Sequence, residues 1–176
     1  MGVLLPLAAT LAACSTGSPA ASGLAFEGDG VRFVAPPGWH VRSASQLTFA
    51  AGSGLALIAN QPLNDDCIGS IGEDCPAPVA SLRDGGVLLI WLTTHCAGPA
   101  CVIPDGPLTT VGGRMASIAD LAESACPAIG QTEETIYVVA VSPQRLDTLV
   151  ACGRSPSAAT RTTLRTFLDA VDWRTP

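Results

Sequence analysis

Six cysteines in the middle of the chain constrain its fold more than any other feature, because each disulfide would tie two points of the backbone together. They lie at Cys67, Cys75, Cys96, Cys101, Cys126 and Cys152. Six cysteines allow many pairings, but their spacing favours neighbours. We predict Cys67 with Cys75 around a Gly-rich acidic loop and Cys96 with Cys101 around a tight turn, which leaves Cys126 with Cys152. The last pair closes the longest loop and contributes about 3 kcal/mol in the chain-entropy model.

A metal site is the alternative for these cysteines. No Cys-x-x-Cys pair occurs, and neither His40 nor His95 stands at a zinc-finger spacing. Carboxylates beside the first cysteine pair could hold calcium if a closed loop brought them together: Asp65, Asp66, Glu73 and Asp74. The chain lacks the EF-hand pattern, however, and charges on such a loop are usually solvated. We therefore expect no metal ion and no cofactor.

An apolar segment from Gly2 to Ala13 ends at a cysteine. It is shorter than the roughly 20 residues that span a bilayer, and it has the length of a signal-peptide apolar region. Its end, Leu11-Ala12-Ala13-Cys14, resembles the lipobox of bacterial lipoproteins. The resemblance implies that residues 1–13 are a signal peptide and that Cys14 carries lipid. The alternative is an ordinary secretory signal with a chance cysteine, which would also mean export.

Small residues follow Cys14 as far as Gly23 and cannot bury enough apolar surface to order themselves. We expect residues 14–23 to be a lipidated cysteine with a flexible tether, and residues 24–176 to be a single domain. The protein would then be anchored to the outer face of the cell membrane. Three disulfides fit that oxidising location.

The charge of the chain limits its partners. The formal net charge is −6, and all nine basic residues are arginines. Scattered arginines on an acidic chain form no basic stripe for nucleic acid and no polybasic cluster for anionic lipid. We expect contact with the membrane only through the anchor on Cys14, and no contact with nucleic acid.

Apolar patterning predicts a β-rich domain. Val31, Phe33 and Ala35 alternate with their neighbours in a strand that Pro36-Pro37-Gly38 ends. Residues 47–63 predict two strands around a turn at Gly52-Ser53-Gly54. Further strands are expected at residues 39–41, 85–95, 112–121 and 134–142, and in the hairpin partner that follows Pro143. The continuous apolar run at 85–95 is typical of a central strand.

The end of the chain predicts a helix, with Ser155 as its cap and Pro156 as its first residue. One face is apolar, and Arg161 and Arg165 lie off it; the apolar residues are Leu164, Phe167, Leu168 and Val171. Strands followed by a packed terminal helix predict an α+β fold, an antiparallel sheet with flanking helices.

Four stretches together resemble actinobacterial lipoproteins of the PsbP-like α/β sandwich class, which includes extrinsic photosystem subunits and a Ran-binding import factor. They are RFVAPPGW at 32–39, VGGRMA at 111–116, ACGRSP at 151–156 and FLDAVDWR at 167–174. The resemblance covers most of residues 30–174. It implies a sandwich of sheet and helices, here stapled by disulfides, and it brings no catalytic residues.

We expect no enzymatic activity. The strings at 51–55 and 68–72 lack the first glycine of a Gly-x-Ser-x-Gly elbow. Trp39 either packs against the terminal helix or stacks on a ligand, and Arg114 pairs either with a partner or with its own strand neighbours. The predicted role is non-enzymatic binding at the cell envelope, to an envelope protein or a small apolar ligand. The alternative is a ligand carrier or sensor with an apolar pocket between helix and sheet.

Overall fold

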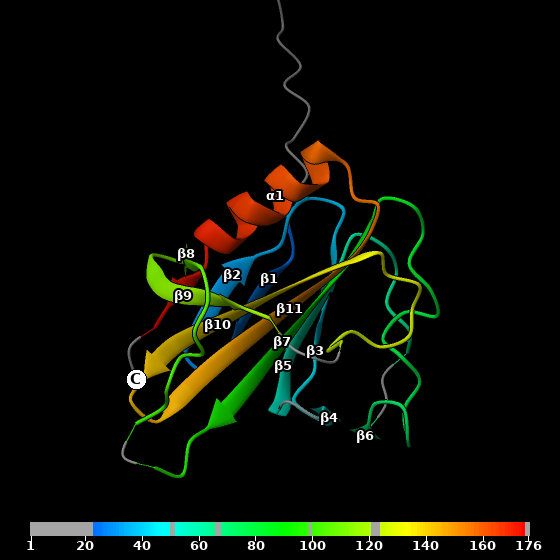
Figure 1. Cartoon of the computed structure of the whole chain (residues 1–176). Helices are drawn as coiled ribbons and strands as arrows, with labels where there is room; N and C mark the ends of the chain where they lie inside the picture. The colour runs from blue at the N-terminus through cyan, green and yellow to red at the C-terminus, as the bar shows by residue number, and fades with distance from the viewer. Residues whose placement is uncertain (1–22, 50–51, 66–67, 99, 121–123, 175–176) are drawn as a thin grey trace, which may run out of the picture.

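The structure is a computed structural model that describes residues 23–49, 52–65, 68–98, 100–120 and 124–174. A nine-stranded sheet forms its centre (Figure 1). Its strands are β3 (His40–Ser43), β4 (Leu47–Phe49), β5 (Gly52–Ala59), β6 (Gly69–Ser70), β7 (Gly86–His95), β8 (Leu108–Val111), β9 (Arg114–Ala119), β10 (Glu133–Ser142) and β11 (Arg145–Arg154). They follow the order β6-β4-β5-β7-β11-β10-β9-β8, and β3 pairs with β5.

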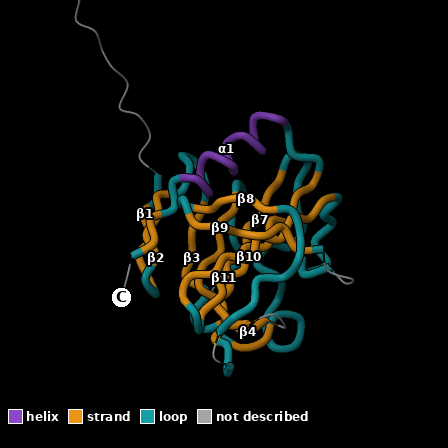
Figure 2. The backbone as a smooth tube through the Cα atoms, turned by 60° about the vertical axis from the view of Figure 1, so that its left-hand side comes forward, coloured by secondary structure: helices purple, strands orange, loops and turns teal. Residues whose placement is uncertain are grey.

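A second, smaller sheet and one helix cover a face of the large sheet. The small sheet contains β1 (Ala25–Gly28), β2 (Val31–Val34) and β12 (Asp172–Trp173), and the helix is α1 (Ala158–Asp169). In Figure 2 the small sheet lies to the left of the large one, and α1 lies above both. Phe33 of β2 joins the three parts, since its ring stacks on Trp91 of β7 and meets Phe167 of α1 edge to face, with centroids 5.5 and 5.3 Å apart.

The large sheet is buried on both faces. Along β7, Leu89 and Trp91 face α1 and the small sheet, while Leu88, Ile90 and Leu92 belong to a second core cluster. Loop residues such as Val79, Leu82 and Ile129 pack into that second cluster. A strand with two buried faces has a continuous apolar sequence, so the prediction of a central strand at 85–95 is confirmed.

The fold is mostly β, and this corrects two expectations. The sheet is mixed, because β4 and β6 pair in parallel while the other pairs are antiparallel. Within the described residues the chain forms one helix instead of several, and loops take the place of helices on the second face. These loops are rich in Pro and Gly, which favour turns over helices. No described helix is long and apolar enough to cross a membrane.

The turn expected at Gly52-Ser53-Gly54 is wrong, because these residues are the start of β5. A Cβ atom on Gly54 would lie 2.4 Å from the carbonyl oxygen of Ala44, so the glycine allows two backbone segments to approach closely. A bulge follows between Gly54 and Ala56.

The helix also begins later than expected. Ser157, not Ser155, is the N-cap, and its hydroxyl accepts a hydrogen bond from the backbone N–H of Thr160 at 3.1 Å. Ser155 has a positive φ of 46°, which turns the chain between β11 and the helix. The predicted apolar face is confirmed, because Phe167, Leu168 and Val171 are buried and Leu164 packs against the same cluster.

Two of the predicted cysteine pairs are formed, Cys96–Cys101 and Cys126–Cys152. Disulfides form and persist in oxidising compartments, so they indicate an extracytoplasmic location. Cys67 and Cys14 lie outside the described residues, and the third disulfide and the lipid anchor stay predictions.

Candidate binding pocket

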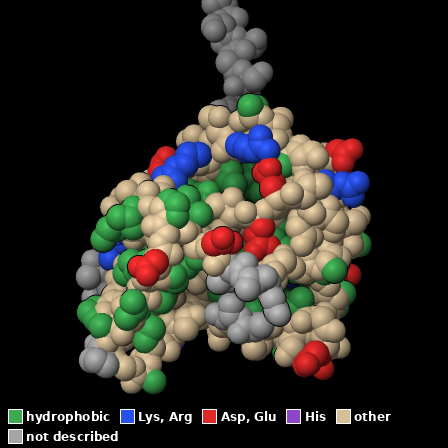
Figure 3. All heavy atoms as spheres, viewed as in Figure 1, with side chains coloured by type: hydrophobic (Ala, Val, Ile, Leu, Met, Phe, Trp, Pro, Cys, Tyr) green, Lys and Arg blue, Asp and Glu red, His purple; other side chains and the backbone are tan. Residues whose placement is uncertain are grey.

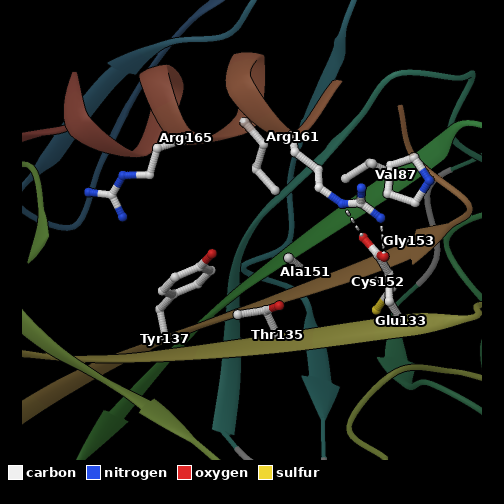
Figure 4. Close-up of a pocket in the computed structure, with 11 residues that line it drawn as sticks. Val87, Glu133, Thr135, Tyr137, Ala151, Cys152, Gly153, Arg161 and Arg165 are labelled. Carbon is white, nitrogen blue, oxygen red and sulfur yellow. Dashed lines mark hydrogen bonds and ion pairs between the residues drawn. The ribbon is translucent and has the colours of Figure 1, made fainter. Parts of the chain in front are cut away.

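A pocket of about 270 Å³ lies between α1 and strands β7, β10 and β11. Figure 4 shows its lining, with Arg161 and Arg165 on the helix side and Thr135 and Tyr137 on the sheet side. On the surface in Figure 3, apolar side chains lie in a hollow below the helix, between two groups of basic side chains. The pocket is therefore open to solvent and has an apolar interior.

Side chains of a strand alternate between the two faces of the sheet, and this places every second residue of β10 in the pocket. Glu133, Thr135 and Tyr137 alternate along β10 and so share the face that α1 covers. Thr135 pairs with Ala151 of β11, and Glu133 pairs with Gly153. Because Ala151 and Gly153 are small, the sheet leaves space beneath the first half of the helix.

The helix places two arginines at the rim. Arg161 and Arg165 are four residues apart and project from one face. Arg161 Nη2 donates to Glu133 Oε2 at 2.6 Å, which bridges helix and sheet. Arg165 pairs with Asp169 and reaches β8, where its Nη1 donates to Thr109 Oγ1 at 3.2 Å. Both arginines lie off the buried stripe, as predicted, but each has a specific partner.

Tyr137 is the most distinctive polar group of the pocket. Its hydroxyl points toward the helix (Figure 4) and makes no hydrogen bond to a described residue. Burial raises its pKa above the usual value, and the charge of Arg165 opposes that rise only in part. The phenol is therefore neutral near pH 7 and can donate or accept a hydrogen bond.

The two residues selected from the sequence lie elsewhere. Trp39 is 8% exposed and belongs to the core that faces α1 and the small sheet, which favours its packing interpretation. Arg114 donates from Nη1 to the carbonyl oxygen of Val141 at 2.9 Å, and its guanidinium carbon lies 5.8 Å from the centroid of the Trp173 ring. Neither residue lines the pocket. A partner contact at either one stays a prediction.

The other candidate sites do not converge in the described part of the chain. His40 and His95 are exposed at strand ends, at the start of β3 and the end of β7. Among the described residues no three His, Cys, Asp or Glu side chains form a group that could hold a metal. Asp66 lies outside these residues.

The sequence raised a pocket between helix and sheet as an alternative but did not identify its lining, because a strand pattern shows which residues share a face and not how closely a helix packs on it. Small residues in β11 opposite an apolar helix were the available signal. Comparison with known proteins finds no match: no family model, curated protein or solved structure matches the chain.

Proposed function

We propose that this chain is a lipid-anchored protein of the cell envelope, in the PsbP-like sandwich class, and that it binds a small ligand without transforming it. The observation that carries this proposal is the pocket between α1 and the large sheet, with the Tyr137 hydroxyl inside it, which has no hydrogen-bond partner among the described residues. Binding sites for small molecules combine apolar walls with a few polar groups that orient the ligand. Leu164, Ala151 and Val87 supply such walls here.

The chemistry of the lining supports binding more than catalysis. A nucleophilic hydroxyl requires a base within hydrogen-bond reach. The lining contains one free hydroxyl-bearing candidate besides Tyr137, which is Thr135. Its one cysteine, Cys152, is held in a disulfide. Glu133 is engaged by Arg161, and neither histidine lines the pocket.

The anchor is tested by metabolic labelling in a bacterial host that acylates lipoproteins. The intact chain should incorporate labelled palmitate and sediment with membranes. Cys14→Ala should lose both properties, because its thiol is the proposed acceptor, whereas Ser15→Ala should retain them. A Cys14→Ala variant that still labels and sediments equally would contradict the anchor.

Ligand binding is tested by purifying the intact protein from membranes and analysing the small molecules that it carries by mass spectrometry. Ala151→Leu and Thr135→Ile should each fill the pocket and lose the bound molecule, while retaining native circular dichroism. Ala159→Leu, at an exposed position of α1, is the matched control and should retain it. If no molecule carried by the native protein is lost in both filled variants, the pocket is not a ligand site.

A further inference from the structure

The Tyr137 hydroxyl lines the pocket, points toward the helix and makes no hydrogen bond to a described residue. The charged pair of the lining is engaged at the other end, where Arg161 uses Nε and Nη2 on Glu133, at 3.3 and 2.6 Å. The hydroxyl can therefore donate to a ligand group that accepts hydrogen bonds.

The electrostatic environment of the hydroxyl is positive. Among the charged side chains, Arg165 is the one that shifts the pKa of Tyr137, and it lowers it. Arg165 is fixed in place, because Nη2 donates to the carbonyl oxygen of Thr110 at 2.5 Å and Nη1 donates to Thr109. Its hydrogen bond to Asp169 raises its own pKa, so it stays charged. Arg165 therefore favours an anion over a cation beside the hydroxyl, while the carboxylate of Glu133 is paired with Arg161 at the other end of the pocket.

The remaining lining is apolar and short. Leu164 forms the helix wall, Ala151 lies on the sheet between the polar groups, and Pro156 closes the end toward the loop. A volume of about 270 Å³ is at the small end of ligand sites. It limits the apolar part of a ligand to a short chain or one small ring.

We propose that this pocket selects a small carboxylate with an apolar chain. The carboxylate accepts a hydrogen bond from the Tyr137 hydroxyl on the side of the pocket that Arg165 lines, and the chain lies on Ala151 and Leu164. This inference rests on the proposed ligand-binding function and specifies its ligand class. Charge-assisted hydrogen bonds of this kind are stronger than neutral ones, so a neutral ligand of equal length binds more weakly.

The probes are straight-chain alkanoates of increasing length, compared with 1-alkanols and alkylammonium ions of the same length. Titration calorimetry on the intact protein should show alkanoate affinity rising about fourfold per methylene until the pocket is full. The matched alkanols should bind at least about tenfold more weakly, and alkylammonium ions should not bind. Tyr137→Phe should weaken alkanoate binding about tenfold or more. It removes one oxygen that has no partner in the described residues, so the fold is retained.

A spectroscopic readout locates the bound charge. Tyr137 is the single tyrosine of the chain, so tyrosinate absorbance during a pH titration reports this hydroxyl alone. A bound carboxylate should raise its pKa further, because a nearby anion disfavours the phenolate. Alkanols at the same occupancy should raise it less. Binding that leaves the tyrosine titration unchanged would place the carboxylate elsewhere and overturn the proposal.

The two proposals fail in different ways. If alkanols bind as tightly as alkanoates, or if no alkanoate binds while Ala151→Leu still removes a co-purified molecule, the carboxylate class is wrong and ligand binding stands. If the native protein also carries nothing that the filled variants lack, both proposals fall.

Discussion

Replacing Arg145 with methionine should destabilise the fold by about 3–5 kcal/mol, because it leaves a buried carboxylate without its counter-charge. The side chain of Asp147 is 0% exposed and lies in β11. It accepts from Arg145 Nε at 2.7 Å and Nη2 at 2.9 Å, and from Trp91 Nε1 at 2.8 Å. Burial acts to lower the pKa of Arg145, but Asp147 and Asp29 outweigh burial and raise it.

The double variant Arg145→Met/Asp147→Leu separates the charge from the hydrogen bonds. With both charges gone, the main remaining cost is the Trp91 indole N–H, which loses its acceptor, and such an orphaned donor costs about 1–3 kcal/mol. The Thr93 hydroxyl also loses its acceptor on Asp147, but that hydrogen bond is longer, at 3.3 Å. The double variant should therefore be more stable than Arg145→Met alone by about 2 kcal/mol, although it removes more native contacts.

Urea unfolding of the oxidised proteins, followed by circular dichroism, measures both differences if the m-values agree. Arg174→Met is the matched control. Its side chain is 50% exposed and pairs with Asp172 at 2.9 Å, so its loss should cost less than about 1 kcal/mol. The reasoning is refuted if the double variant is no more stable than Arg145→Met, because the buried charge would then not dominate the loss.

Three further variants test the helix and the pocket. Phe167→Ala should lower the free energy of unfolding by about 3–5 kcal/mol in urea, because it empties the contact with the small sheet, while Thr166→Ala on the exposed face should change it by less than about 0.5 kcal/mol; equal losses would contradict this packing. Ser157→Ala should cost about 1 kcal/mol through loss of the cap, and a value near zero by the same measurement would contradict the assigned cap. The pKa of Tyr137 is raised in the folded protein, so its contribution to stability is complete below the unfolded value of about 10 and is lost as pH rises through the folded pKa. Tyr137→Phe cannot ionise, so its melting temperature should fall less than that of the parent as pH rises above about 10. Parallel pH profiles of the two melting temperatures would contradict this.

The sequence allowed the central strands to be predicted, because alternation and continuous apolar runs depend directly on burial. β2 alternates between buried and exposed residues, and β7 is buried almost throughout. The cysteine pairs followed from loop length, as shown by Cys96–Cys101 and Cys126–Cys152. These features are local, or connect segments close enough in the sequence for spacing to indicate them.

What could not be predicted depends on tertiary contacts. β12 has two residues, too few to show a period, and it forms because the chain after α1 returns to β2. Arg165 lies off the apolar face as expected, but the sequence did not show that it spans from the helix to the backbone of Thr110. The size and lining of the pocket likewise depend on how closely α1 packs over Ala151, which no pattern along one segment specifies.

The short strands at both ends of the large sheet have a consequence for molecules crowded on a surface. An exposed strand edge invites pairing with another chain and is a route to aggregation. At one edge, β8 has four residues, and the carbonyl oxygen of Thr110 already accepts a hydrogen bond from Arg165. At the other side of the sheet, β5 pairs with two short strands, β3 of four residues and β4 of three. In the described part of the chain neither edge presents a long, straight template. Copies held side by side can therefore collide without adding strands to one another.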